Sequence, residues 1–308
     1  MTDVAALGLS KAFGPIRAVQ DLSFTAPAGQ VTGFLGPNGS GKTTTLRMML
    51  GLVRPNAGQA LIGGRPYEQW PQPRRLVGAV LEATGFHPGR RGRDHLRVLA
   101  SAAGIQHERV DTVLDRVGLT NDAGRRTGSY SLGMRQRLGL AAAMLGEPEV
   151  LILDEPANGL DPAGMAWLRR LLRNEAAEGR AVLVSSHVLS EVAQTVDRVV
   201  IINAGRLRFA GPLQELGGRD VSVRTPETAR LRELLHRHGY AANAPVDSTL
   251  SVQGATADEI GHLAAQAGIP LSHLNDTDIS LEAAFLRLTA DDGPPDPTSA
   301  STPAAGAR

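Results

Sequence analysis

Apolar runs alternate with helix-like segments over the first two thirds of the chain. Three apolar runs are typical of strands buried on both faces of a parallel sheet: residues 31–35, 150–153 and 181–185. Shorter strand-like segments occupy residues 4–9, 18–24, 57–64 and 76–81, and a hairpin pattern spans 199–209. In residues 93–103 and 108–117, apolar positions recur instead with helical spacing. The pattern predicts an α/β fold with a mostly helical insert over about residues 83–145.

The pattern of predicted elements changes at Gly217 and Gly218. Strands and helices are then expected to alternate three times, with strands at 220–224, 249–253 and 269–274 and helices at 227–238, 257–267 and 281–288. We therefore expect a main domain over residues 1–217 and a small C-terminal α+β domain over residues 218–290. Residues 291–308 are mostly Pro, Ala, Ser, Thr and Asp, a composition that predicts a disordered tail.

Composition narrows the class of protein. The 308 residues carry a net charge of +1, so no overall field attracts nucleic acid or an anionic membrane surface. The chain has no cysteine, which excludes disulfides and thiolate metal sites and fits a reducing compartment. No apolar run approaches the roughly 18 residues of a membrane span, and residues 1–20 lack the pattern of a signal peptide. We expect a cytoplasmic protein, whose action at a membrane would need another chain to supply the spans.

A glycine-rich loop joins the first buried run to a helix-like stretch over residues 44–50. It consists of Gly36, Pro37, Asn38, Gly39, Ser40, Gly41, Lys42 and Thr43, and is followed by Thr44. A strand, a glycine loop and a helix in this order form the context that a phosphate-binding loop requires. Backbone amides and the dipole at a helix N-terminus favour an anion, and glycines let the backbone approach it. The loop predicts a site for nucleotide phosphates; the alternative is a glycine-rich turn without a ligand.

The last two residues of this loop have suitable chemistry. Lys42 is expected to contact the β- and γ-phosphates, and the Thr43 hydroxyl is expected to bind Mg²⁺. The chain has 32 lysine and arginine residues, but only Lys11 and Lys42 are lysines. A compact ammonium fits among phosphate oxygens where a planar guanidinium would not. The choice of lysine at this position therefore supports the phosphate site.

Two carboxylates and a histidine follow buried strands. Ligands bind at the C-terminal strand ends of open α/β sheets, so Asp154 and Glu155 are expected to face the phosphates. Asp154 suits the Mg²⁺ shell, and Glu155 suits a base that polarises the attacking water. The alternative for this pair is a solvated acidic turn. His187 follows the next buried strand, and is either structural or able to reach the γ-phosphate.

Two other positions have two interpretations each. Ser131 precedes a helix rich in alanine and leucine, and either caps its N-terminus or takes part in a second phosphate site. Phe13 lies between two short strands, and is either a core or turn aromatic or a platform on which an adenine ring stacks.

Together these stretches resemble the nucleotide-binding subunit of ATP-binding cassette (ABC) transporters over about residues 4–211. The matching segments are the Walker A loop at 36–43, the signature at 130–134, the Walker B strand at 151–155, the D-loop at 158–161 and the switch histidine at 187. The resemblance implies a P-loop NTPase core with an antiparallel β subdomain and a helical insert, and hydrolysis of ATP with Mg²⁺. It also implies that Phe13 stacks on adenine, and that Ser131, Gly133 and Asp161 contact a nucleotide. The catalytic residues it implies are Glu155, His187 and Lys42.

Two positions depart from the family pattern. Leu132 stands where the family has the first glycine of its LSGGQ signature, and we expect its side chain to weaken the phosphate contact there. Glu82 stands at the family's Q-loop glutamine. Its carboxylate can bind Mg²⁺ but repels the γ-phosphate oxygens, so we expect altered coupling or slower turnover.

The resemblance also implies partners. In this family ATP lies between the Walker motifs of one subunit and the signature of another, so a homodimer or a dimer with a related ATPase chain is expected. A separate permease would hold the dimer at the inner face of the membrane. A single cassette with a small C-terminal domain looks most like bacterial exporters of drugs, antibiotics or lipids. Apart from the resemblance, a further hypothesis is that the small domain is a regulatory or sensory module. Its three expected strand–helix units could bind a small ligand or pack against the same domain of the other subunit.

The alternative is a soluble ABC-type ATPase that acts on ribosomes or DNA. Translation factors of that kind carry two cassettes in one chain, whereas this sequence has one. DNA-repair ATPases of that kind contain long coiled coils, but no heptad run appears here. The near-neutral charge also argues against a nucleic-acid partner.

Overall fold

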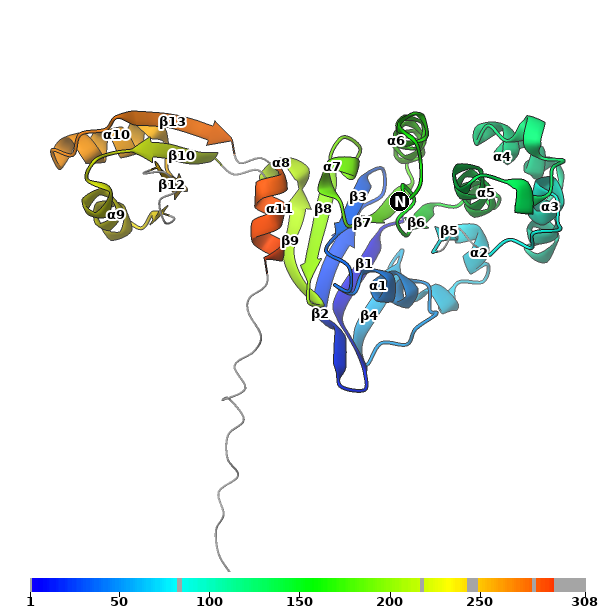
Figure 1. Ribbon diagram of the computed structural model, residues 1–308. Helices are drawn as coiled ribbons and strands as arrows, with labels where there is room; N and C mark the ends of the chain where they lie inside the picture. Colours follow the sequence, from blue (N-terminus) through cyan, green and yellow to red (C-terminus); the bar gives the residue numbers. More distant parts are fainter. Residues whose placement is uncertain (1, 82–84, 217–218, 243–248, 279–280, 291–308) are drawn as a thin grey trace, which may run out of the picture.

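The computed structural model describes residues 2–81, 85–216, 219–242, 249–278 and 281–290 (Figure 1). Its largest sheet has the strand order β5-β6-β7-β3-β8-β9. The strands are β3 (Val31–Leu35), β5 (Val77–Val80), β6 (Val150–Leu153), β7 (Ala181–Ser186), β8 (Arg198–Asn203) and β9 (Arg206–Pro212). All neighbours pair in parallel except β9, which is antiparallel to β8. The strand before the glycine loop, β3, therefore lies inside the sheet between β7 and β8.

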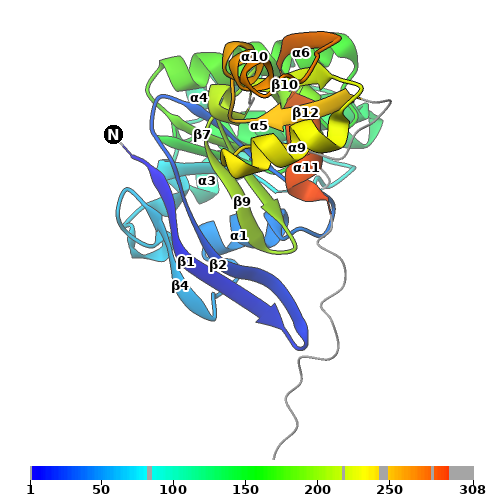
Figure 2. The ribbon, with the colours of Figure 1, turned by 90° about the vertical axis from the view of Figure 1, so that its left-hand side faces the viewer.

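A second sheet is antiparallel and has the order β2-β1-β4 (Figure 2). Its strands are β1 (Val4–Phe13), β2 (Ile16–Ala26) and β4 (Ala57–Ile62). Rings of Phe24 on β2 and Phe34 on β3 stack with centroids 5.2 Å apart, and join the two sheets in one apolar core. The expected strands at 4–9 and 18–24 are too short, because a tight turn at Gly14 lets pairing continue to Phe13 and Ile16. Phe13 thus ends a strand and is not part of a connection.

Helices pack around the six-stranded sheet. The helices are α1 (Lys42–Met49), α2 (Pro73–Leu76), α3 (Gly92–Ala102), α4 (Glu108–Arg116), α5 (Leu132–Met144), α6 (Pro162–Ala177), α7 (Leu189–Val192) and α8 (Leu213–Leu216), with 3-10 turns η1 (Tyr67–Gln69), η2 (Thr120–Asp122) and η3 (Thr127–Ser129). Buried apolar residues of α3 to α6 form a core with strands β6 and β7. Residues 85–145 are mostly helical, as the periodicity predicts.

A buried ion cluster ties the helical insert to the core. Glu175 on α6 is only 1% exposed and pairs with Arg116 of α4 at 2.7 Å and with Arg180, which precedes β7, at 3.1 Å. Burial raises the pKa of the Glu175 carboxyl, although both guanidinium groups oppose this effect. Removal of either partner would therefore leave a poorly compensated buried charge.

The C-terminal domain has a sheet of its own, in the order β11-β12-β10-β13, with every neighbouring pair antiparallel. Its elements are β10 (Arg219–Arg224), α9 (Thr228–Arg237), β11 (Ala241–Ala242), β12 (Thr249–Gln253), α10 (Ala257–Gln266) and β13 (His273–Asp278). This β-α-β-β-α-β order is that of a ferredoxin-like unit. Apolar residues such as Val221, Leu231 and Leu250 give it a separate core.

Three elements of this region differ from the expectation. The strand β11 was not expected, because two alanines carry no strand pattern. The last strand begins at His273 and not at Ile269, because Ile269 and Leu271 pack in the core below α10 before the strand starts. The helix α11 (Leu281–Thr289) was expected within the small domain, but it packs on the main domain beside α7, α8 and β9 (Figure 1). Ala284 is buried in the main core, and Asn203 Nδ2 donates to Thr289 O at 3.1 Å.

The small domain was expected to span residues 218–290, and the structure bears on both of these limits. Residues 217–218 and the tail 291–308 lie outside the described residues. By its packing, the segment 281–289 belongs with the main domain. Across the described ranges, no helix combines the length and the apolar character needed to cross a membrane.

Candidate functional site

The glycine loop connects the C-terminal end of β3 to α1. A Cβ on Gly36 would overlap the backbone oxygen of Ile202 on β8 and lie 2.6 Å from Ser40 Oγ. A Cβ on Gly41, whose φ is +103°, would overlap the backbone oxygen of Ala18 on β2. The loop is thus held against both sheets, directly before the first turn of α1.

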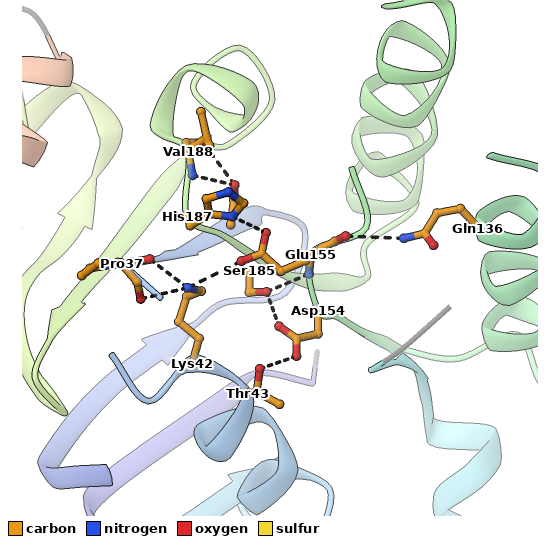
Figure 3. Close-up of polar contacts among 11 residues, drawn as sticks. Pro37, Lys42, Thr43, Gln136, Asp154, Glu155, Ser185, His187 and Val188 are labelled. Atoms are coloured by element: carbon orange, nitrogen blue, oxygen red, sulfur yellow. Dashed lines mark hydrogen bonds and ion pairs between the residues drawn. The ribbon is translucent and has the colours of Figure 1, made fainter. Parts of the chain in front are cut away.

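Lys42 begins α1 and is buried. Its Nζ donates to the backbone oxygens of Gly36 at 2.8 Å and Pro37 at 3.3 Å, and lies 3.5 Å from Glu155 Oε1 (Figure 3). The ammonium therefore points back over the loop toward the end of β6. A phosphate bound by the loop would compete with the Glu155 carboxylate for this cation.

Thr43 and Asp154 meet at the same place. Thr43 Oγ1 donates to Asp154 Oδ2 at 2.7 Å, and Ser185 Oγ donates to Asp154 Oδ1. Asp154 is 7% exposed, so these two hydroxyls satisfy a carboxylate that is nearly excluded from water. The parallel pairing of β6 with β7, and of β7 with β3, brings these three residues together.

Glu155 and His187 complete this network. His187 Nδ1 lies 2.9 Å from Glu155 Oε2, and the Glu155 amide donates to Ser185 Oγ at 2.8 Å. Glu155 has φ +48°, a left-handed backbone conformation that is costly for a residue with a side chain. The strain turns the carboxylate toward Lys42 and His187 (Figure 3). Asp154 and Glu155 therefore do not form a solvated acidic turn.

Two residues of the network escaped the sequence analysis. Ser185 is the last residue of the strand expected at 181–185, and its position one strand away from Asp154 was the available signal. Gln136 lies inside α5 and donates from Nε2 to the backbone oxygen of Glu155 at 3.5 Å. Nothing in the local sequence distinguishes this glutamine from a surface residue, although it is 3% exposed.

Ser131, Gly133 and Asp161 lie together elsewhere. They line a groove of about 430 Å³ between the start of α5 and the start of α6, whose lining includes none of the residues 36–44. Ser131 Oγ accepts from the Met134 amide at 3.2 Å, and Asp161 Oδ1 accepts from the Gly164 amide at 2.7 Å. Both residues are helix caps, as one of the two interpretations of Ser131 predicts.

Tyr130 anchors this second region to the helical insert. Its hydroxyl donates to the Asp122 backbone oxygen at 2.8 Å, and the side chain is 3% exposed. Burial, followed by the nearby Asp122 carboxylate, raises the pKa of the Tyr130 phenol. The start of α5 is therefore held rigidly by a neutral buried ring.

Phe13 lies at the tip of the β1–β2 hairpin and is 49% exposed, so it is not a core aromatic. Lys11 Nζ lies 5.0 Å from the centroid of its ring. The hairpin reaches the phosphate loop because Ala18 of β2 contacts Gly41. The Phe13 ring is half exposed, and the Lys11 ammonium lies over one of its faces. The other expected ligand, Glu82, lies outside the described residues.

The chain is similar to known proteins over most of its length. The profile of the family described as "ABC transporter" matches residues 19–158, and that of a domain of unknown function (DUF8746) matches residues 219–282. The bacitracin transport ATP-binding protein BcrA of Bacillus licheniformis is 36% identical, covering 93% of this chain and 97% of that protein. The Nod factor export ATP-binding protein I of Burkholderia lata is 34% identical, covering 91% of this chain and 95% of that protein. A solved ATP-binding subunit of an ABC transporter is 25% identical with a TM-score of 0.63, covering 85% of this chain and 99% of that one.

Proposed function

This chain belongs to the ABC transporter family of ATP-binding subunits, and we propose that it hydrolyses ATP to power export through a separate membrane permease. Two relatives that it matches along almost their whole length are named for bacitracin transport and Nod factor export. These two cargoes differ in chemistry, and the proposed cargo class is a drug, an antibiotic or a lipid. The proposed site of action is the inner face of the cell membrane, where the permease holds the chain.

One observation carries the proposal: residues from three separate segments form a single contact network around the loop. Lys42 pairs with Glu155, Glu155 contacts His187, and Thr43 contacts Asp154. A general base, a phosphate-binding cation and an oxygen donor set for a cation thus lie within one cluster. A merely structural ion pair would not need the strained backbone of Glu155 or the hydrophilic loop in front of it.

We assign Thr43 and Asp154 to a Mg²⁺ ion. Their oxygens lie 2.7 Å apart, and both are hard donors of the kind that this ion prefers. Mg²⁺ is commonly bound through one or two protein oxygens, with phosphates and water completing its shell. When bound, the ion neutralises charge on the phosphate oxygens.

The other residues have roles that follow from their positions. The amides of residues 39–44 face the phosphates, and Lys42 moves from Glu155 to the β- and γ-phosphates. Glu155 then accepts a proton from the attacking water, and His187 orients the Glu155 carboxylate and contacts the γ-phosphate. Phe13 stacks on the adenine ring.

We further propose a head-to-tail homodimer, or a dimer with a related ATPase chain. The groove that contains Ser131 and Gly133 shares no lining residue with the phosphate loop, which supports a signature that serves the nucleotide of another subunit. Under this proposal the Ser131 hydroxyl donates to a phosphate oxygen of that nucleotide, while its oxygen still accepts from the Met134 amide.

The function is tested by purifying the chain from its native membrane with and without ATP. We expect a polytopic membrane protein to copurify and an ATPase activity that Lys42→Ala abolishes. Copurification of ribosomes or DNA, with no membrane protein, would overturn the transport function while leaving the ATPase site intact. Sedimentation with ATP and Mg²⁺ tests the dimer, and a strictly monomeric but fully active protein would exclude it.

A further inference from the structure

Leu132, the residue that departs from the family signature, is seated on the D-loop of the same chain. A Cβ built on Gly159 would overlap Leu132 Cδ2 and lie 2.8 Å from Leu132 Cγ. Leu132 is 48% exposed, so its outer half faces solvent while its tip covers the Gly159 backbone. Gly159 has φ +74°, a conformation that glycine adopts without strain. The Leu132 side chain therefore occupies the space that a side chain at position 159 would need.

The loop under Leu132 is a short, hydrogen-bonded path to the catalytic carboxylate. The Asn158 amide donates to Glu155 O at 3.2 Å, and the Leu160 amide donates to Ala157 O at 3.1 Å. The path ends at Asp161, which caps α6. Two consecutive turns thus connect Glu155 to the position that Leu132 covers.

The same helix touches this loop at a second point. Gln136, one turn further along α5 than Leu132, donates from Nε2 to Glu155 O at 3.5 Å (Figure 3). Residues at i and i+4 lie on the same face of a helix. The first turns of α5 therefore contact the Glu155 loop at both of its ends, with Leu132 at one and Gln136 at the other.

We propose that Leu132 is a positioning residue, which couples the start of α5 to the Glu155 loop through Gly159. The second part of this inference, a link between two ATP sites, rests on the dimer proposed above. In that dimer the start of α5 faces the partner's nucleotide. A shift of α5 on nucleotide contact would then move the Glu155 carboxylate that serves the chain's own nucleotide. The leucine that replaces a glycine is in this view a link between the two ATP sites.

The contact is tested by introducing Gly159→Ala into two backgrounds, the natural chain and Leu132→Ala. Leu132→Ala removes Cγ and Cδ2 and leaves Cβ, which lies 3.7 Å from the built Gly159 Cβ, an ordinary contact. We expect Gly159→Ala to lower kcat about tenfold or more in the natural chain, and by less than about threefold in the Leu132→Ala background. The apparent KM for ATP should change little, because the phosphate loop is untouched.

Gly179→Ala is the matched control, because Gly179 has φ +93° but no atom within 4 Å of a built Cβ. Its cost reflects backbone strain alone and should be equal in both backgrounds. Equal losses for Gly159→Ala in both backgrounds would overturn the proposed coupling. This comparison tests a contact within one chain, so its result can be interpreted even if sedimentation shows no dimer.

The Hill coefficient for ATP tests the link between sites. Leu132→Ala should lower it toward 1 while the thermal midpoint of unfolding stays unchanged. An unchanged Hill coefficient in a protein that does dimerise would refute the link. A chain that does not dimerise would instead contradict the proposed assembly.

Discussion

Replacing Glu155 with glutamine separates two proposed roles of this carboxylate, as the partner of Lys42 and as the base. Glu155 Oε1 lies 3.5 Å from Lys42 Nζ, and Glu155 Oε2 contacts His187. Two unit charges at 3.5 Å attract by about 5 kcal/mol at an effective dielectric constant of about 20. Most of this attraction offsets the cost of burying the two groups. We therefore take about 1.4 kcal/mol as the net amount that an incoming phosphate must overcome.

Glu155→Gln should consequently raise ATP affinity by about tenfold, because Lys42 is then free to meet the phosphates. The same change removes the base, and should lower kcat by about 10²–10⁴-fold. The amide keeps the shape of the side chain, so the fold and the left-handed backbone at this position remain. The ATP-bound variant should accumulate as a dimer, since hydrolysis no longer opens it.

Affinity is measured by titrating a fluorescent ATP analogue, and turnover by release of inorganic phosphate. Glu227→Gln is the control, because Glu227 pairs with Arg230 in the C-terminal domain and should change neither value. A normal rate of turnover in Glu155→Gln would refute the assignment of the base. Unchanged ATP affinity together with a lost rate would show that the Lys42 pair does not restrain binding.

Three other results are expected. Lys42→Ala should abolish ATP binding in the same titration, whereas Lys11→Ala, at the only other lysine, should not; equal losses would remove the special role of the loop lysine. Arg116→Ala should lower the free energy of unfolding in urea by about 2–3 kcal/mol, because it leaves buried Glu175 short of a cation, and a loss below about 0.5 kcal/mol would contradict this. Burial raises the pKa of Glu175, so the folded state binds its proton more readily. The stability that this carboxyl contributes is therefore fully present below its ordinary pKa and is lost as pH rises through the raised value. Relative to Glu175→Gln, the natural chain should gain stability as the pH is lowered toward 4.5. The opposite dependence of stability on pH would refute the direction of this pKa shift.

Local patterns were sufficient for most of the fold and for the phosphate loop. The apolar run 150–153 matches β6 residue for residue, and residues 31–35 match β3. A parallel strand buried on both faces has to be continuously apolar, and a phosphate loop has to contain glycines and a lysine at set spacings. These requirements act over a few residues, so the sequence displays them directly. The resemblance to a known family rests on the same stretches, and the comparisons confirm it.

Local patterns predicted the small domain less well. The helix over residues 281–289 has an ordinary amphipathic pattern, which gives no indication of the partner that it covers. Only the tertiary structure shows that Ala284 is buried against the main domain. The last strand was displaced for a related reason, because apolar residues such as Ile269 and Leu271 fill a core as well from a loop as from a strand.

The sequence by itself identified the residues to which we assign the chemistry in the proposed function: Lys42, Thr43, Asp154, Glu155 and His187. The tertiary structure decided their geometry, because the order of β3, β6 and β7 in the sheet sets which strand ends are neighbours. That order brings Ser185 to Asp154, and the packing of α5 brings Leu132 to Gly159 and Gln136 to Glu155. Contacts between residues far apart in the chain depend on how whole elements pack, and a local pattern carries no record of a distant partner.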